Sequence, residues 1–229
     1  LMLVSNTAQA RIDSTDRALM LTGNASQARV DPTDRALALS EDLPAGALKQ
    51  RLQSCADGAF SATEFSIAHR GAPLGYPEHS REGYIAAAKM GAGVIECDVT
   101  FTQDLELVCR HSQCDLASST NILQTPLANT CREPFTPAKF GRPASAQCCT
   151  SDITLAQFKT LCARPDVANP QARTVAEYLA PLNSPVVETP NECGTVMRHR
   201  DSIELIRKLG TKFVPELKRP EVPMPCRGF

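Results

Sequence analysis

The stretch "EFSIAHRGAPLGYPEHSREGYIAAAKMGAGVIECDV", residues 64–99, has the pattern of a strand, a helix and a second strand. Its first apolar run ends at His69, and Ser80 is suited to cap a helix over residues 81–90. The segment "GVIECDV" (93–99) has the apolar composition of a buried strand. This order predicts two parallel strands joined by a right-handed crossover.

The chain after this unit continues the same alternation of strands and helices. Residues 105–111, "LELVCRH", alternate in polarity and are expected to fold back beside the second strand. Residues 112–151 are rich in Pro, Ser, Thr and Cys, which predicts a long loop tied by cysteines. Further patterns predict helices over 152–162, 174–182 and 199–210 and a third parallel strand over 211–217. The fold class is therefore predicted to be α/β.

Composition restricts the possible partners. The chain has 229 residues, 42% of them hydrophobic, and a formal net charge of -1, which suffices for one sizeable core. It has no basic excess that would attract nucleic acid or anionic lipid. No apolar run has the length needed to cross a bilayer, so stable membrane insertion is not expected. A small molecule is the favoured partner.

Ten cysteines indicate an oxidising compartment, and we expect the protein to be secreted or periplasmic with disulfide bonds. A structural zinc site is the alternative, but the sequence has no CxxC pair. Spacing alone leaves the disulfide pairing open. The opening "LMLVSNTAQA" resembles the end of a secretory signal with its cleavage site at residues 8–10.

Two domains are expected. Residues 1–54 form an N-terminal extension that contains a tandem repeat, because the sequence from Asn6 returns from Asn24 with a period of 18 residues. Two copies are too few for a solenoid, so we expect a peripheral leader with weak order. Residues 55–229 form the main domain, which includes the insertion 112–151.

Three carboxylates suggest a cation site. Glu96 and Asp98 are one residue apart in an expected strand, so both side chains project from one face, while Cys97 points to the other. Two such carboxylates repel each other unless a cation lies between them, and oxygen ligands favour Ca²⁺ or Mg²⁺. A salt-bridged pair is the alternative. Glu216, near the end of the third expected strand and followed by Lys218, strengthens the metal interpretation.

Two histidines and two positively charged side chains complete the candidate site. His69 and His111 fall at strand ends, where two imidazoles suit proton transfer near neutral pH. Arg70 and Lys218 are candidates to bind phosphate oxygens. Singly, a strand-end histidine or a lysine is more often a structural or surface residue. Together these residues predict phosphoester cleavage.

The motifs "HRG", "PEHS", "ECDVTFTQD", "LVCRH" and "PELK" resemble those of the glycerophosphodiester phosphodiesterase family, in its secreted, cysteine-rich microbial branch. The resemblance covers residues from about 55 to the end of the chain. It implies a TIM barrel with an insertion after the second strand, and metal-dependent hydrolysis of glycerophosphodiesters to glycerol 3-phosphate and an alcohol. It also implies roles for seven residues: acid and base for His69 and His111, phosphate binding for Arg70 and Lys218, and metal binding for Glu96, Asp98 and Glu216.

Three features depart from the family pattern. His79 stands where Asn is usual, and Ser112 stands where an Asp often follows the second histidine. A complete barrel takes about 250 residues, so we expect this chain to be the N-terminal part of such an enzyme. Two alternatives remain open: an inactive fragment or phosphate-binding protein, and a phospholipase D of the related toxin type.

Overall fold

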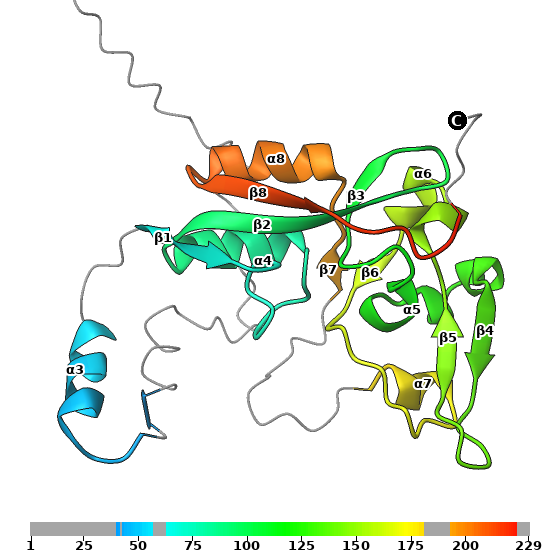
Figure 1. Ribbon diagram of the computed structural model, residues 1–229, viewed down its shortest axis with the longest axis horizontal. Coiled ribbons are helices and arrows are strands. Elements are labelled where there is room, and N and C mark those ends of the chain that lie inside the picture. Colours follow the sequence, from blue (N-terminus) through cyan, green and yellow to red (C-terminus); the bar gives the residue numbers. More distant parts are fainter. Residues whose placement is uncertain (1–39, 42, 57–62, 181–192, 224–229) are drawn as a thin grey trace, which may run out of the picture.

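The structure is a computed structural model that describes residues 40–41, 43–56, 63–180 and 193–223 (Figure 1). The expected N-terminal repeat lies outside the described residues. A four-stranded sheet forms the centre of the molecule. Its strands are β1 (Thr63–Ala68), β2 (Ala92–Phe101), β3 (Leu107–Cys109) and β8 (Lys212–Leu217).

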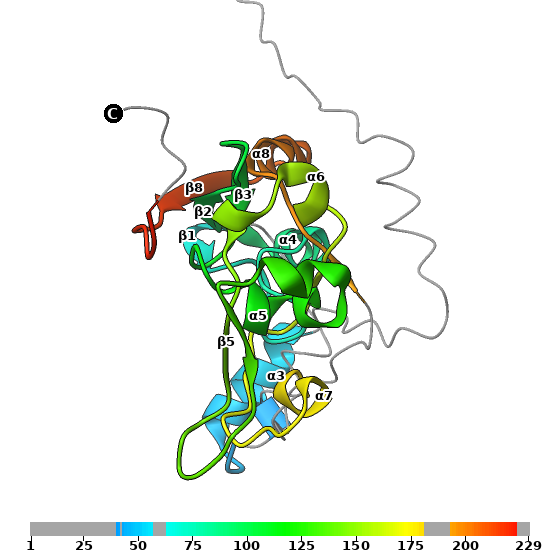
Figure 2. The ribbon, with the colours of Figure 1, turned by 90° about the vertical axis from the view of Figure 1, so that its right-hand side faces the viewer.

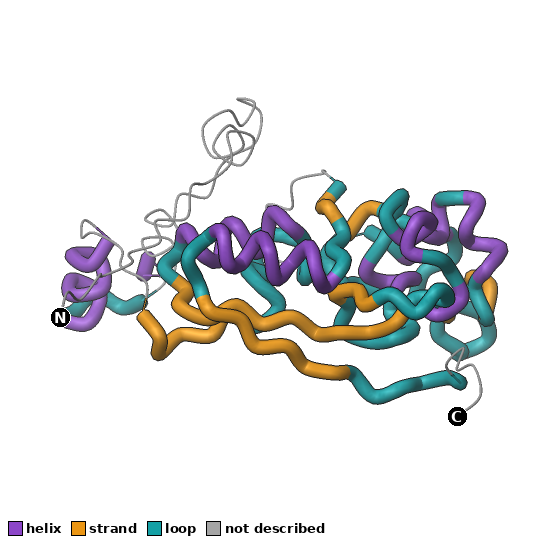
Figure 3. The backbone as a smooth tube through the Cα atoms, turned by 90° about the horizontal axis from the view of Figure 1, so that it is seen from above, coloured by secondary structure: helices purple, strands orange, loops and turns teal. Residues whose placement is uncertain are grey.

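The sheet has the strand order expected of three consecutive barrel strands. The long strand β2 pairs in parallel with β1 on one side and with β8 on the other, while β3 returns antiparallel along the end of β2. Helix α4 (Arg81–Lys89) connects β1 to β2, and α8 (His199–Lys208) leads into β8. Figure 3 shows these two helices on one side of the strands. The predicted α/β class, with three parallel strands of a partial barrel, is therefore confirmed.

Local sequence explains how β1, α4 and β2 fit together. The hydroxyl of Ser80 accepts a hydrogen bond from the backbone N–H of Gly83 and so caps α4, as predicted. Gly93 allows β2 to approach β1 closely, because a Cβ there would overlap the carbonyl oxygen of Thr63. Buried side chains such as Tyr84, Ile95 and Ile206 pack between the sheet and its two helices.

The insertion of the structure is the whole segment between β3 and α8, which extends beyond the expected 112–151 and packs at one end of the sheet (Figures 1 and 2). It has a hydrophobic core of its own, with Leu116, Ile122 and Phe158 fully buried. Its elements are α5 (Leu116–Ser119), η1 (Ile122–Gln124), η2 (Pro126–Thr130), β4 (Glu133–Thr136), β5 (Ser145–Gln147), η3 (Thr150–Asp152), α6 (Leu155–Phe158), β6 (Cys162–Ala163), α7 (Val175–Tyr178) and β7 (Gly194–Thr195). An additional helix, α3 (Ala47–Ala56), precedes the sheet.

The two helices expected over 152–162 and 174–182 were predicted too long. Each is a single turn, α6 or α7, which begins at a threonine whose side chain caps it. The first stops early because Cys162 pairs with β7 as part of β6. The apolar side chains that suggested long helices pack instead into the core of the insertion, where Phe158 and Tyr178 are buried.

Four disulfides lie in the described part of the chain. Three tie the insertion together: Cys114–Cys149, Cys131–Cys148 and Cys162–Cys193. The fourth, Cys97–Cys109, joins β2 to β3. The prediction of disulfides is confirmed for these eight cysteines, while the side chains of the other two cysteines lie outside the described residues. Within the described ranges, the structure contains no helix long and apolar enough to span a membrane.

Candidate functional site

Three carboxylates meet at the face of the sheet opposite the helices. Glu96 and Asp98 project from β2, and the register of the parallel pair places Asp98 beside Glu216 of β8. Glu96 and Asp98 are buried, with 6% and 0% exposure, whereas Glu216 is exposed. The register therefore places the three proposed metal ligands on one face, but among the described residues there the ligand atoms close enough to hold a metal are those of Glu96, Asp98 and His79, while the carboxylate of Glu216 contacts Lys218.

The two oxygens of each buried carboxylate have different surroundings. Oε2 of Glu96 accepts from the backbone N–H of Arg70 at 2.7 Å, and Oδ2 of Asp98 lies 2.9 Å from Nε2 of His79. Oε1 of Glu96 is buried without a hydrogen bond from any described residue, and Oδ1 of Asp98 is buried beside Nζ of Lys218, which lies 3.2 Å away. Buried anionic oxygens without a partner are costly, so this arrangement fits a hard cation such as Ca²⁺ or Mg²⁺.

The charges of the site separate the pKa values of the two buried carboxylates. Burial, together with the negative charges of Asp98 and Glu216, raises the pKa of Glu96 to about 7. Burial acts in the same direction on Asp98, but the hydrogen bond from His79 and the charge of Lys218 outweigh it and lower the pKa of Asp98 to about 2. Asp98 is thus ionised at neutral pH. Glu96 is only partly ionised there, and a positive charge beside it would favour its ionised form.

The two positively charged side chains proposed from the sequence to bind phosphate, Arg70 and Lys218, both lie at these carboxylates. Nη1 of Arg70 donates to Oε2 of Glu78 at 2.8 Å, and its Nε lies 3.7 Å from Oδ2 of Asp98. Nζ of Lys218 is 2.7 Å from Oε1 of Glu216 and forms an ion pair with Oδ1 of Asp98 at 3.2 Å. Glu78 therefore holds the guanidinium of Arg70 in this orientation.

His69 and His111 lie at the ends of strands that flank the carboxylates. His69 directly follows β1 and is exposed, and its neighbour Arg70 contacts Glu96. His111 is half-buried and follows Arg110, whose backbone N–H donates to the carbonyl of Asp98 at 3.0 Å. Among the described residues, no hydrogen bond or ion pair joins either imidazole to the carboxylates. Their catalytic role remains a prediction.

His79 is closer to the carboxylates than either of these histidines. It is fully buried, with Nε2 at Asp98 and Nδ1 3.1 Å from the hydroxyl of Tyr84. Burial lowers the pKa of His79 to about 4, so the ring is neutral at neutral pH. In the sequence it stands out only as a departure from the family motif; the available signal was a second imidazole directly after Glu78.

Arg110 is the second residue whose importance was not predicted. Its guanidinium is fully buried and donates to the carbonyls of Cys109 and Glu78 and to the hydroxyl of Ser119, the last at 3.0 Å. These bonds connect β3, the loop before α4 and the insertion, so Arg110 holds three parts of the site in place. The available signal was a charged residue directly after the apolar run "LVC".

Asp115 lies in the same buried region and gives the protein a pH-dependent stability. Burial raises the pKa of Asp115 from its ordinary 3.8 to about 7, because the charge of nearby Arg110 offsets only part of the desolvation. The folded chain therefore retains a proton that the unfolded chain releases, and stability falls as the pH rises from about 4 to about 7.

We expect the substitution Asp115→Asn to raise the free energy of unfolding by about 2–4 kcal/mol at about pH 8 and by almost nothing near pH 4. Urea unfolding at both pH values measures the difference. The exposed Asp201, which pairs with Lys159, is the control, and Asp201→Asn should change stability by less than about 1 kcal/mol at either pH. A stabilisation that does not depend on pH would contradict this assignment.

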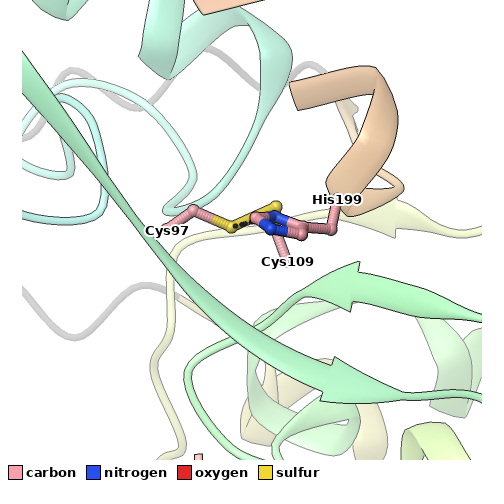
Figure 4. A group of neighbouring side chains, drawn as sticks. All are labelled: Cys97, Cys109 and His199. Carbon is pink, nitrogen blue, oxygen red and sulfur yellow. Dashed lines mark hydrogen bonds between the residues drawn. A yellow bond between two sulfur atoms is a disulfide. The ribbon is translucent and has the colours of Figure 1, made fainter. Parts of the chain in front are cut away.

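The opposite face of β2 carries a sulfur-containing group, shown in Figure 4. Cys97 and Cys109 form a disulfide, and Nδ1 of His199, at the start of α8, lies 3.5 Å from Sγ of Cys97. These three residues have ligand atoms close enough to hold a metal. Because metals bind the thiolate and both sulfurs are in a disulfide, this group is not a zinc site in the oxidised protein.

The family model described as "Glycerophosphoryl diester phosphodiesterase family" matches residues 69–221, a range that contains all seven residues proposed from the sequence. Two curated relatives match shorter segments. An "Extracellular protein" of Arthroderma benhamiae is 42% identical over 66 residues, which are 28% of this chain and 26% of the relative. "Probable glycerophosphodiester phosphodiesterase 1" of Mycobacterium tuberculosis is 45% identical over 58 residues, 25% of this chain and 21% of the relative.

Solved structures of similar fold have low sequence identity. A glycerophosphodiester phosphodiesterase from Agrobacterium tumefaciens is 18% identical, with a TM-score of 0.42 over 71% of this chain and 49% of that one. An Oleispira antarctica phosphodiesterase, solved in complex with the product sn-glycerol-3-phosphate, is 20% identical, with a TM-score of 0.39 over 67% and 44% of the two chains. This chain spans about a quarter of the curated relatives it matches and about half of these solved chains.

Proposed function

This chain belongs to the glycerophosphoryl diester phosphodiesterase family, and from that premise we propose that it hydrolyses glycerophosphodiesters to glycerol 3-phosphate and an alcohol. The observation that carries the proposal is the β2–β8 register, which sets Glu216 beside Asp98 on the strand face that also carries Glu96. Oε1 of Glu96, which is buried without a hydrogen bond from the described residues, and Oδ1 of Asp98, which lies beside Lys218, support the use of these carboxylates as a cation site.

In the proposed reaction each side chain has one task. Glu96, Asp98 and Glu216 would hold Ca²⁺ or Mg²⁺, which would supply positive charge to the phosphate oxygens. Arg70 binds the phosphate through its planar guanidinium, whose orientation Glu78 controls through the bond to Nη1. Lys218 adds a point charge at the same place. One of His69 and His111 accepts a proton from the nucleophile, and the other protonates the leaving oxygen.

The test is hydrolysis of glycerophosphocholine by the purified chain, with glycerol 3-phosphate measured as product. We expect turnover with Ca²⁺ or Mg²⁺ and its loss with a chelator. Glu216→Gln should lower turnover by at least about tenfold, because it removes one charged ligand. The matched control is Glu204→Gln on α8, an exposed carboxylate away from the site, which should leave turnover unchanged.

The outcomes separate the proposal from its alternatives. Turnover that is insensitive to the chelator or to Glu216→Gln would overturn the mechanism. A folded chain that binds the cation without hydrolysing the substrate would favour the phosphate-binding alternative. Cleavage of choline lipids, without glycerol 3-phosphate release from glycerophosphocholine, would favour the phospholipase D alternative.

We also propose that the protein works outside the reducing cytosol, as a secreted or periplasmic enzyme. Four disulfides support this location, since such bonds persist in oxidising compartments. The fungal relative is called an extracellular protein, which agrees with it.

A further inference from the structure

We propose that His79 is a positioning residue, which orients Asp98 for the cation and is itself held in one tautomer by Tyr84. This inference rests on the cation site of the proposed function. It assigns a role to a position where the chain departs from the usual family motif, since His79 stands in place of Asn.

The hydrogen-bond chemistry determines the tautomer. The carboxylate of Asp98 can only accept a hydrogen bond, so Nε2 of His79, 2.9 Å from Oδ2, must carry the proton. A neutral ring has one N–H, which leaves Nδ1 as an acceptor. The hydroxyl of Tyr84, 3.1 Å away and fully buried, therefore donates to Nδ1. The chain of bonds runs from Tyr84 through His79 to Asp98.

This chain of bonds determines which oxygen of Asp98 is available. Oδ2 is occupied by His79, and Oδ1 is directed to the side where Lys218 and Glu216 lie, with Nζ of Lys218 at 3.2 Å. Glu96 shows the same division, because the backbone N–H of Arg70 holds its Oε2 and Oε1 has no hydrogen bond. One N–H at the first oxygen of each carboxylate thus directs the second oxygen to the proposed cation site, where Lys218 already lies beside that of Asp98. Hydrogen bonds to ligating carboxylates commonly change metal affinity 10–100-fold.

The local backbone holds the ring in place. His79 has a φ of 54°, in the left-handed region that residues other than glycine rarely adopt. Its N–H donates to the carbonyl of Arg70 at 3.1 Å, which links the turn to the end of β1. Strain of this kind persists only where surrounding contacts hold it, and here the contacts are with residues of the cation site.

The test is calorimetric titration of the cation-free chain with Ca²⁺ and with Mg²⁺, at a temperature where circular dichroism shows every variant folded. His79→Leu removes the donor and should weaken binding about 10–100-fold. His79→Gln retains a side-chain N–H at similar reach and should restore affinity to within about threefold of the parent. Tyr84→Phe should have a smaller effect than His79→Leu and should shift the ring nitrogens, observed by NMR, toward a mixture of tautomers.

A purely structural role for His79 predicts a different result, in which the Leu and Gln variants lose stability while binding in their folded states equals that of the parent. That result would overturn the inference, as would an Nδ1-protonated ring in the parent or a parent that binds neither cation. Binding is measured without substrate, so the two proposals fail separately. A parent that binds the cation in a His79-dependent way but does not hydrolyse glycerophosphocholine contradicts only the proposed function.

Discussion

Alanine at either His69 or His111 is expected to lower kcat for glycerophosphocholine hydrolysis by about 10²–10⁴-fold, the usual contribution of a general acid or base. Each histidine follows a strand and adjoins an arginine that is bonded to a carboxylate residue. The backbone N–H of Arg70 donates to Glu96, and that of Arg110 donates to the carbonyl of Asp98. Neither imidazole holds the carboxylates, so cation affinity and the folded structure should stay unchanged. Steady-state kinetics with calorimetry on the same samples measures both quantities.

The matched control is His199→Ala, because His199 lies on the helix-covered face of the sheet, beside Cys97. We expect this variant to retain the turnover of the parent. The double variant of His69 and His111 should be little worse than either single variant, since residues that act in one reaction are strongly non-additive. Parental turnover in either single variant would remove that histidine from the mechanism.

Replacement of Arg110 by methionine is expected to have the largest effect on stability, a loss of about 3–5 kcal/mol. The guanidinium is fully buried and bonds Cys109, Ser119 and Glu78, so its removal leaves three acceptors without a donor. Its charge also offsets part of the cost of burying Asp115 and Glu78. Urea unfolding measures the change in free energy.

Arg110→Lys separates charge from geometry, because lysine retains the charge and lacks the planar fork. It should fall between the parent and the Met variant. Arg132 provides the control: it pairs with Asp152 at the surface, with 38% of its side chain exposed, and Arg132→Met should cost less than about 1 kcal/mol. A change of similar size in the Met variants of Arg110 and Arg132 would mean that burial of Arg110 contributes little.

The sequence was sufficient to predict the parallel sheet and the carboxylate group. Strand periodicity placed Glu96 and Asp98 on one face, and the third strand brought Glu216 to them because strands linked by helices run parallel. The cap at Ser80 was predicted for the same reason, since its hydroxyl acts on the adjacent turn. These features depend on short-range patterns, which a single sequence contains.

The roles of His79 and Arg110 depend on side-chain contacts between residues far apart in the sequence. Hydrophobic periodicity does not predict such contacts. His79 bonds Asp98, 19 residues away, and Arg110 bonds the carbonyl of Glu78, 32 residues away. The insertion was also underestimated for this reason: its order depends on three disulfides and a separate core, and the pairing of cysteines cannot be derived from their spacing.

The disulfide between Cys97 and Cys109 joins β2, which carries Asp98, to β3, which ends two residues before His111. Cys97 is the residue between Glu96 and Asp98, and Cys109 is two residues before His111, so the cross-link lies directly behind the site. Both cysteines are buried, with 1% and 0% exposure, so an external thiol such as glutathione reaches the bond only when the strands separate. The folded site thereby protects the cross-link, worth about 3 kcal/mol, that aligns its own strands.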